Sequence, residues 1–166
     1  MNLSESLHFI PGKLSADTAS SIFYTQYVDL LDLNHVTFVA NITEFGSSAA
    51  TDTWDVSIEV TTAAGTAVGT AAGFYYRLST SALGADEMGD VTKRASSDVA
   101  ALTSAATGCL LVVDVDPAQV ETDVPSARWV RLVITPPDTD NAVTNLDAIA
   151  IGVAKHAQTS MRSTTA

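Results

Sequence analysis

The stretch that decides the fold is Thr53-Trp54-Asp55-Val56-Ser57-Ile58-Glu59-Val60-Thr61, in which apolar and polar side chains alternate. Successive side chains of a strand point to opposite faces of the sheet. One face therefore carries Trp54, Val56, Ile58 and Val60, and the other carries Asp55, Ser57, Glu59 and Thr61. The pattern predicts a half-buried antiparallel strand with Trp54 on the core side.

Similar strand patterns recur along the chain, separated by turn residues. They cover residues 27–33, 35–43, 68–79, 109–115, 127–135 and 146–154, with a shorter candidate at 88–93. Asp116 followed by Pro117 predicts a helix cap and the first residue of one helical turn. Many short strands without a long amphipathic helix predict an all-β fold, an antiparallel β-sandwich of jelly-roll-like type with extended N- and C-terminal arms.

The length of 166 residues suits a single domain with one core. Residues 1–24 are expected to form an N-terminal arm, residues 25–154 the β-sandwich domain and residues 155–166 a C-terminal tail. The chain begins without the basic and apolar regions of a secretory signal, and no stretch approaches the roughly 20 apolar residues of a membrane span. Synthesis in the cytoplasm, without membrane binding, is the expectation.

The formal net charge is −11, from 8 Lys and Arg against 19 Asp and Glu. This balance argues against direct nucleic-acid binding, because phosphate contacts require Lys and Arg. Charged residues make up only 16% of the chain, below the usual share of about a quarter. A surface so poor in charge is expected to be covered partly by Thr, Ser and Ala and partly by a partner.

Residue types that carry chemistry are present, but not in catalytic or metal-binding arrangements. Cys109 precedes an apolar run and is predicted to be buried. The histidines His8, His35 and His156 lack metal-ligand spacing, and the loop 138–141 lacks the Gly and Glu of a calcium EF-hand. Nucleophile-elbow, phosphate-loop and dinucleotide motifs are also absent from the sequence. We therefore expect a protein without enzymatic activity, cofactor or metal, with a loosely built Ca²⁺ site on the 138–141 loop as an alternative.

Two strands have a face that is unusual for the surface of a monomer. In 127–135, the core side is expected to carry Val130, Leu132 and Ile134, and the outer side Trp129, Arg131 and Val133. Trp and Arg are enriched at the centres of protein interfaces. In 146–154, the face of Ala148, Ala150, Gly152 and Ala154 has neither charge nor bulk, so another backbone can approach closely. Both faces are predicted to form a subunit interface; the alternative is burial inside one sandwich or under the N-terminal arm.

The C-terminal tail has the opposite charge to the rest of the chain. After Asp147 there is no acidic residue, while Lys155, His156 and Arg162 remain. We expect Lys155 and Arg162 to reach onto an acidic neighbouring subunit. A solvated end is the alternative.

Several segments resemble small virion structural proteins of tailed bacteriophages. They are SLHFIP at 6–11, YVDL at 27–30, HVTFV at 35–39, VSIEVTTA at 56–63 and YYRL at 75–78. In those proteins a short arm leads into a tyrosine-marked strand and then into an alternating strand. The similarity covers about half of the chain, and residues 80–108 contribute nothing further to it.

The resemblance implies a capsid decoration or cement protein on the virion surface, which binds the outside of the major capsid shell without any cofactor or reaction. Its partners would be the major capsid protein and copies of itself, with a trimer as one arrangement. Many copies on one shell gain from multivalency, so that each contact can be modest. A tail or head–tail connection component is the alternative within virions, and a carbohydrate-binding or adhesin-like β-sandwich is the alternative from another class.

Overall fold

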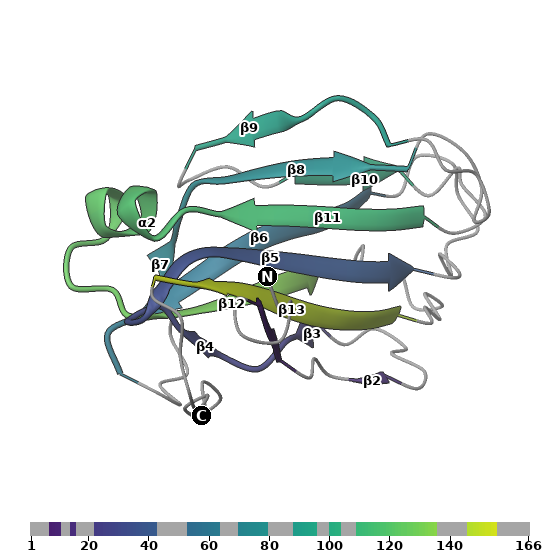
Figure 1. The fold of residues 1–166 in the computed structure, drawn as a ribbon. Coiled ribbons are helices and arrows are strands. Elements are labelled where there is room, and N and C mark those ends of the chain that lie inside the picture. Colours follow the sequence, from purple (N-terminus) through teal and green to yellow (C-terminus); the bar gives the residue numbers. More distant parts are fainter. Residues whose placement is uncertain are drawn as a thin grey trace.

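The computed structural model describes residues 7–10, 14–15, 22–42, 53–63, 70–79, 88–95, 100–103, 109–135 and 146–155. Within these ranges two antiparallel sheets pack together, accompanied by one short helix (Figure 1). The predicted antiparallel β-sandwich is confirmed.

Sheet A has seven strands, in the order β1-β13-β5-β11-β8-β9, and β2 also pairs with β13. Its members are β1 (Leu7–Ile10), β2 (Leu14–Ser15), β5 (Leu33–Ile42), β8 (Phe74–Leu78), β9 (Thr92–Arg94), β11 (Cys109–Val115) and β13 (Leu146–Ala154). The longest pairings are those of β5 with β13 and with β11. The last strand, β13, therefore lies between β1 and β5, two strands from the first 42 residues of the chain.

Sheet B has six strands, in the order β10-β6-β12-β3, with β4 beside β12 and β7 beside β6. Its members are β3 (Phe23–Tyr24), β4 (Val28–Asp29), β6 (Thr53–Thr61), β7 (Thr70–Ala71), β10 (Ala100–Thr103) and β12 (Trp129–Thr135). The chain crosses repeatedly from one sheet to the other, so each sheet combines segments that are distant in the sequence.

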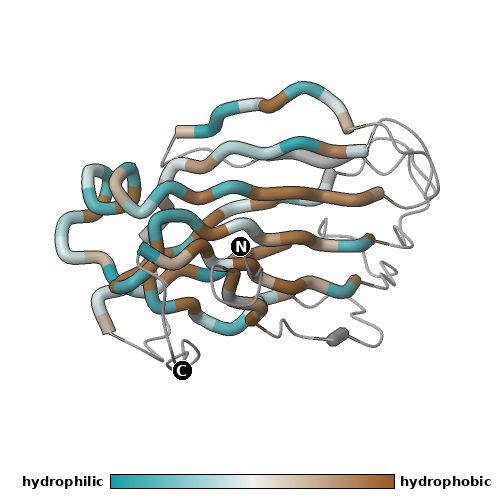
Figure 2. The backbone as a smooth tube through the Cα atoms, in the orientation of Figure 1, coloured by the Kyte–Doolittle hydropathy of each residue, from teal (hydrophilic) through white to brown (hydrophobic). Residues whose placement is uncertain are grey.

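The core lies between the sheets and follows the predicted alternation. In β6 the side chains of Trp54, Val56 and Ile58 are at most 2% exposed. In β5 and β11 every second residue is likewise buried. Figure 2 shows the hydrophobic residues concentrated along β5, β11 and β13. Alternation over long strands therefore placed the core correctly, because one face of each sheet must leave water.

The helix after β11 begins as the sequence predicts. Asp116 is the N-cap, its carboxylate accepts a hydrogen bond of 2.9 Å from the Ala118 N–H, and Pro117 opens the helix. Helix α2 (Pro117–Asp123) is longer than the single turn expected, and Val120 is fully buried. That buried contact favours the second turn.

The predicted strand at 27–33 is wrong in its length. Only Val28–Asp29 forms a strand, and the chain turns before β5 begins at Leu33. The Leu33 N–H donates to the Leu30 carbonyl over 3.2 Å, and the Asp29 carboxylate accepts from the Leu31 N–H over 3.0 Å. This side-chain bond stabilises a turn, and turns of this kind compete with the strand ladder.

The described parts of residues 1–24 are strands of the sandwich. Leu7–Ile10 pairs with β13, and Ile10 is 2% exposed within the core. Phe23–Tyr24 pairs with β12 in the other sheet. The short strand predicted at 88–93 corresponds to β9 at Thr92–Arg94, together with a bridge between Met88 and Ser79.

Candidate functional site

The outward side chains of β12 are largely covered by the chain itself. Val130, Leu132 and Ile134 face the core as predicted, at 0 to 1% exposure. On the opposite side, Val133 is 4% exposed and pairs with Tyr24 of β3. Val133 is therefore buried within this chain, and the predicted subunit interface at this position stays a prediction.

Arg131 is held in a compact cluster on this side of sheet B. Its guanidinium carbon lies 4.1 Å and 4.6 Å from the ring centroids of Tyr24 and Tyr27. Its Nε and Nη2 donate to one oxygen of Glu59 over 2.8 Å and 2.6 Å. Burial raises the pKa of Tyr27, an effect that the nearby Arg131 opposes. The cluster fastens the segment between β3 and β4 onto β12.

Trp129 lies beside a second, more exposed arginine. The Arg128 guanidinium carbon is 5.4 Å from the Trp129 ring centroid, and this side chain also forms a two-pronged pair with Asp29. The hydrogen bond to Asp29 and its charge raise the pKa of Arg128. Trp129 remains partly exposed, so its predicted interface role stays a prediction.

The two faces of β13 are the reverse of those predicted. Ala148 and Ala150 are 3% and 2% exposed and belong to the core, whereas Ile149 is 44% exposed. The small side chains admit a close neighbour, as expected, but that neighbour is in the same chain. A Cβ added at Gly152 would lie 2.9 Å from both methyl carbons of Leu33. Ala148, Ala150 and Gly152 are therefore unavailable as an outer interface.

The outer face of sheet A carries an apolar patch instead. Cross-strand partners share a face, and the register pairs Ile149 with Val39 and Val39 with Val112. It also pairs Phe9 with Ile151. We call this surface the apolar face; its members are Leu7, Phe9, Val39, Val112, Ile149, Ile151 and Val153. Phe9 and Ile149 are its most exposed members, at 59% and 44%.

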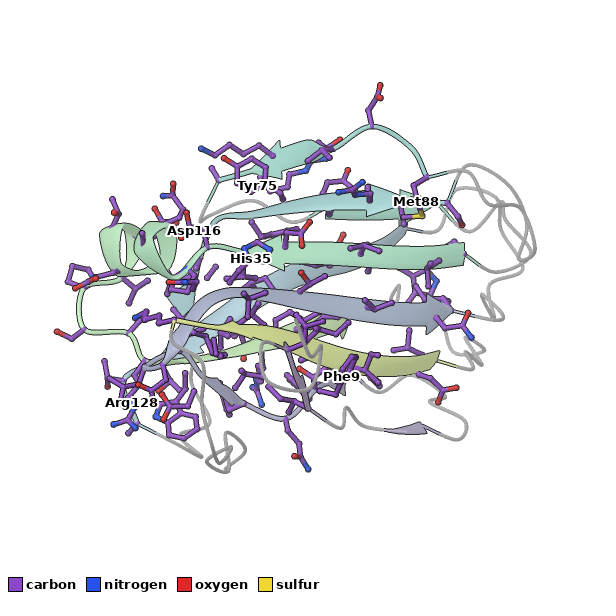
Figure 3. All side chains as sticks on the ribbon, viewed as in Figure 1. Phe9, His35, Tyr75, Met88, Asp116 and Arg128 are labelled. Carbon is purple, nitrogen blue, oxygen red and sulfur yellow. The ribbon has the colours of Figure 1, made fainter. Side chains whose placement is uncertain are left out.

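Polar residues continue the same surface beyond the apolar face. Asp114 accepts a hydrogen bond of 2.7 Å from the Thr37 hydroxyl, and its Oδ1 lies 3.1 Å from the His35 Nε2. Tyr75 is the cross-strand partner of Asp114 on the other side. Figure 3 shows Phe9, His35 and Tyr75 on strands β1, β5 and β8 of this sheet. Asp114 is thus held by two partners from β5.

Sequence reasoning missed the apolar face because it took the large side chains of β13 as the buried ones, although the exposed Asp147 lies on the same face as Ile149. The alternation of Leu7 and Phe9 with His8 and Ile10 was visible, but these residues were assigned to an arm. Their pairing with β13 was the missing information. A partner strand that carries large side chains on one face is the signal that would have oriented β13.

Lys155 lies at the end of β13 and is bound to its own subunit. Its N–H donates to the Asp32 carbonyl over 2.8 Å, and its Nζ to the Leu31 carbonyl over 3.0 Å. A hollow of about 230 Å³ separates it from α2, lined by Leu30, Leu31, Pro117, Glu121, Ala127, Arg128 and Lys155. Arg162 and His156 lie outside the described residues, as does the loop 138–141.

Candidate groups for metal binding do not come together in the described part of the chain. There, no group of three or more His, Cys, Asp and Glu side chains is arranged to hold a metal ion. Cys109 is buried as predicted, and burial raises its pKa to about 11. The described residues include no helix that is long and apolar enough to span a membrane.

Known protein families, curated proteins and solved structures give no significant match to this chain.

Proposed function

We propose that this protein is a non-enzymatic virion structural protein that binds the outside of a capsid shell as a decoration protein. The observation that carries the proposal is the apolar face of sheet A. Exposed apolar patches on soluble proteins commonly mark sites of association, and Phe9 and Ile149 project from this one at 59% and 44% exposure. The segments SLHFIP and HVTFV, on which the resemblance to phage virion proteins rests, contribute β1 and part of β5 to this sheet.

The apolar face is built to present side chains rather than to perform a reaction. Sheet pairing fixes the backbone of β1, β13 and β5, so the outward side chains lose little conformational entropy on docking. Repetition over many copies on one shell would turn a modest contact into a stable layer. In this role the major capsid protein is the main partner, copies of this chain are its neighbours, and the virion surface is its location.

Addition of the purified protein to capsids that lack it tests the proposal. We expect saturable co-sedimentation and new knobs on the shell in electron micrographs. The double variant Phe9→Ser/Ile149→Ser should lose most of the binding, because it removes the two most exposed apolar side chains of the face. The matched control is Ile22→Ser/Leu31→Ser, which removes side chains of 41% and 49% exposure away from the face.

Three outcomes would count against a decoration protein. Equal binding by both double variants would remove the apolar face from the contact. Ring-shaped particles without any binding to capsids would favour the alternative of a tail or head–tail connection component. Specific binding on a glycan array would favour a carbohydrate-binding sandwich.

A further inference from the structure

A basic and aromatic edge lies at the end of sheet A opposite β1. Three of the eight Lys and Arg residues of the chain, Arg77, Lys93 and Arg94, belong to the paired strands β8 and β9. Lys93 lies 5.5 Å from the ring centroid of Tyr75, and Arg94 lies 5.7 Å from that of Tyr76. We call these five residues the basic edge.

The cations of the basic edge have no carboxylate partner among the described residues. The ion pairs of that part of the chain are His35–Asp114, Arg128–Asp29 and Arg131–Glu59. Arg94 donates only to the Tyr76 hydroxyl, over 3.4 Å, and its Nε is buried without an acceptor in the described structure. Asp90, which precedes β9, is exposed and lies outside ion-pair distance. Within the described part of this chain of net charge −11, Lys93 is exposed and has no carboxylate partner, so it can meet an anion of another molecule.

A complementary acidic end lies at helix α2. Residues 95–127 contain no Lys or Arg. Asp116 and Glu121 are exposed, and Asp123 accepts a hydrogen bond of 2.8 Å from the Gly73 N–H just before β8. We call Asp116, Glu121 and Asp123 the acidic end. Figure 3 shows Tyr75 and Asp116 toward the same end of the sandwich.

We infer that the basic edge of one copy docks on the acidic end of a second copy of this chain. A second copy is the partner that charge complementarity favours, because every copy carries both the basic edge and the acidic end. Tyr and Arg are favoured at interface centres, where the rings supply area and the cation supplies direction. At about 0.1 M salt the Debye length is about 10 Å, so local pairing outweighs the repulsion between the two net charges.

This inference rests on the proposed function in one respect: in that role, the contact would join neighbouring copies on a shell. The basic edge adjoins the apolar face, since Arg77 is the cross-strand partner of Val112, but Phe9 and Ile149 lie toward the other side of the sheet and are left for the shell. Self-association is measured without capsids. The protein can therefore bind capsids without self-associating, or self-associate without binding capsids, and the two proposals are tested separately.

Charge exchange between the two surfaces tests the inference. Sedimentation velocity of the full chain, from micromolar to millimolar concentration in 100 mM NaCl, is expected to show concentration-dependent association that weakens in 500 mM NaCl. Lys93→Glu alone and Glu121→Lys alone should each raise the Kd by about tenfold or more, because each places like charges together. Their equimolar mixture, and the double variant in one chain, should restore association.

The matched control is Gln26→Glu/Thr62→Glu, which makes the same change in net charge as Lys93→Glu at two exposed positions outside both surfaces. It should associate like the unsubstituted protein. The inference is overturned if the unsubstituted protein stays monomeric in 100 mM NaCl, or if the control loses as much association as Lys93→Glu. Failure of the mixture to recover would also overturn it. In each of these cases the cations would have one role only, which is to prevent the edge strand β9 from pairing with a strand of another molecule.

Discussion

At the scale of single residues, Arg131 in β12 and Arg128, which immediately precedes β12, have different surroundings. Arg131 has 15% of its side chain exposed and lies against two tyrosine rings, whereas Arg128 has 42% exposed. Each pairs with one carboxylate, Glu59 or Asp29. Exposed ion pairs contribute little because water screens them, but removal of one partner from a covered pair leaves a charge without compensation. Burial therefore decides which arginine stabilises the fold.

Arg131→Ala is expected to lower the free energy of unfolding by about 2–4 kcal/mol, because Glu59 loses its counter-charge and two tyrosines lose a contact. Arg128→Ala serves as the comparison and should cost less, because the Arg128 side chain is more exposed and Asp29 keeps the hydrogen bond from the Leu31 N–H. Urea unfolding measures both variants. Equal losses would show that the covered cluster adds nothing beyond a surface pair.

Cys109 is expected to react slowly with alkylating reagents while the protein is folded. Burial raises the pKa of its thiol from 9.0 to about 11, and the thiolate is the reactive form. At pH 8 the folded protein should therefore hold about a hundredfold less thiolate than the unfolded chain. Labelling with iodoacetamide, followed by mass spectrometry with and without urea, measures the ratio. Its rate in the folded protein should rise as the pH approaches 11, and equal rates in both states would contradict the burial.

At the scale of elements, clear alternation was enough to predict where strands lie, and in Thr53–Thr61 also the inner face. Thr53–Thr61, Cys109–Val115 and Leu146–Ala154 have the predicted bounds. The helix start at Asp116 and Pro117 was equally local, because a cap is set by neighbours in the sequence. These features depend on contacts within a few residues, which a sequence displays directly.

The orientation of β13 could not be predicted from its own sequence. Its larger aliphatic side chains share one face with Asp147 and its Ala and Gly residues form the other, so size and charge point to opposite faces as the buried one. The space beside β5 decides, because Leu33 fills the position where a side chain at Gly152 would lie. The role of β1 was missed for the same reason, since only its pairing with β13 separates a strand from an arm.

Gly152→Val is expected to destabilise the protein by about 1–3 kcal/mol, because the new side chain overlaps the buried methyl groups of Leu33. The double variant Gly152→Val/Leu33→Ala should recover part of the loss by removing the group that is overlapped. Thermal unfolding of the single and double variants measures this coupling. Purely additive losses would mean that Leu33 is not the obstacle.

At the scale of the whole molecule, an acidic chain exposes an apolar surface. The members of the apolar face are uncharged, while Asp147 lies beside Ile149 on the same face of β13 and Asp114 lies farther along the sheet. A net charge of −11 opposes contact between the apolar faces of two copies near neutral pH, although Phe9 and Ile149 are exposed. The same charge leaves a neutral partner surface free to approach the apolar face.

Lowering the pH toward the sequence pI of about 4.3 should therefore bring the apolar faces into contact. Protonation of carboxylates removes the repulsion between copies, while the apolar contact is unaffected, so solubility should fall steeply from pH 6 to about 4.3. Phe9→Ser/Ile149→Ser has the same charge at every pH and should remain more soluble than the unsubstituted protein. Ile22→Ser/Leu31→Ser, which removes comparable apolar area elsewhere, should precipitate like the unsubstituted protein. Light scattering across this pH range measures all three, and identical curves would show that loss of charge alone drives the association.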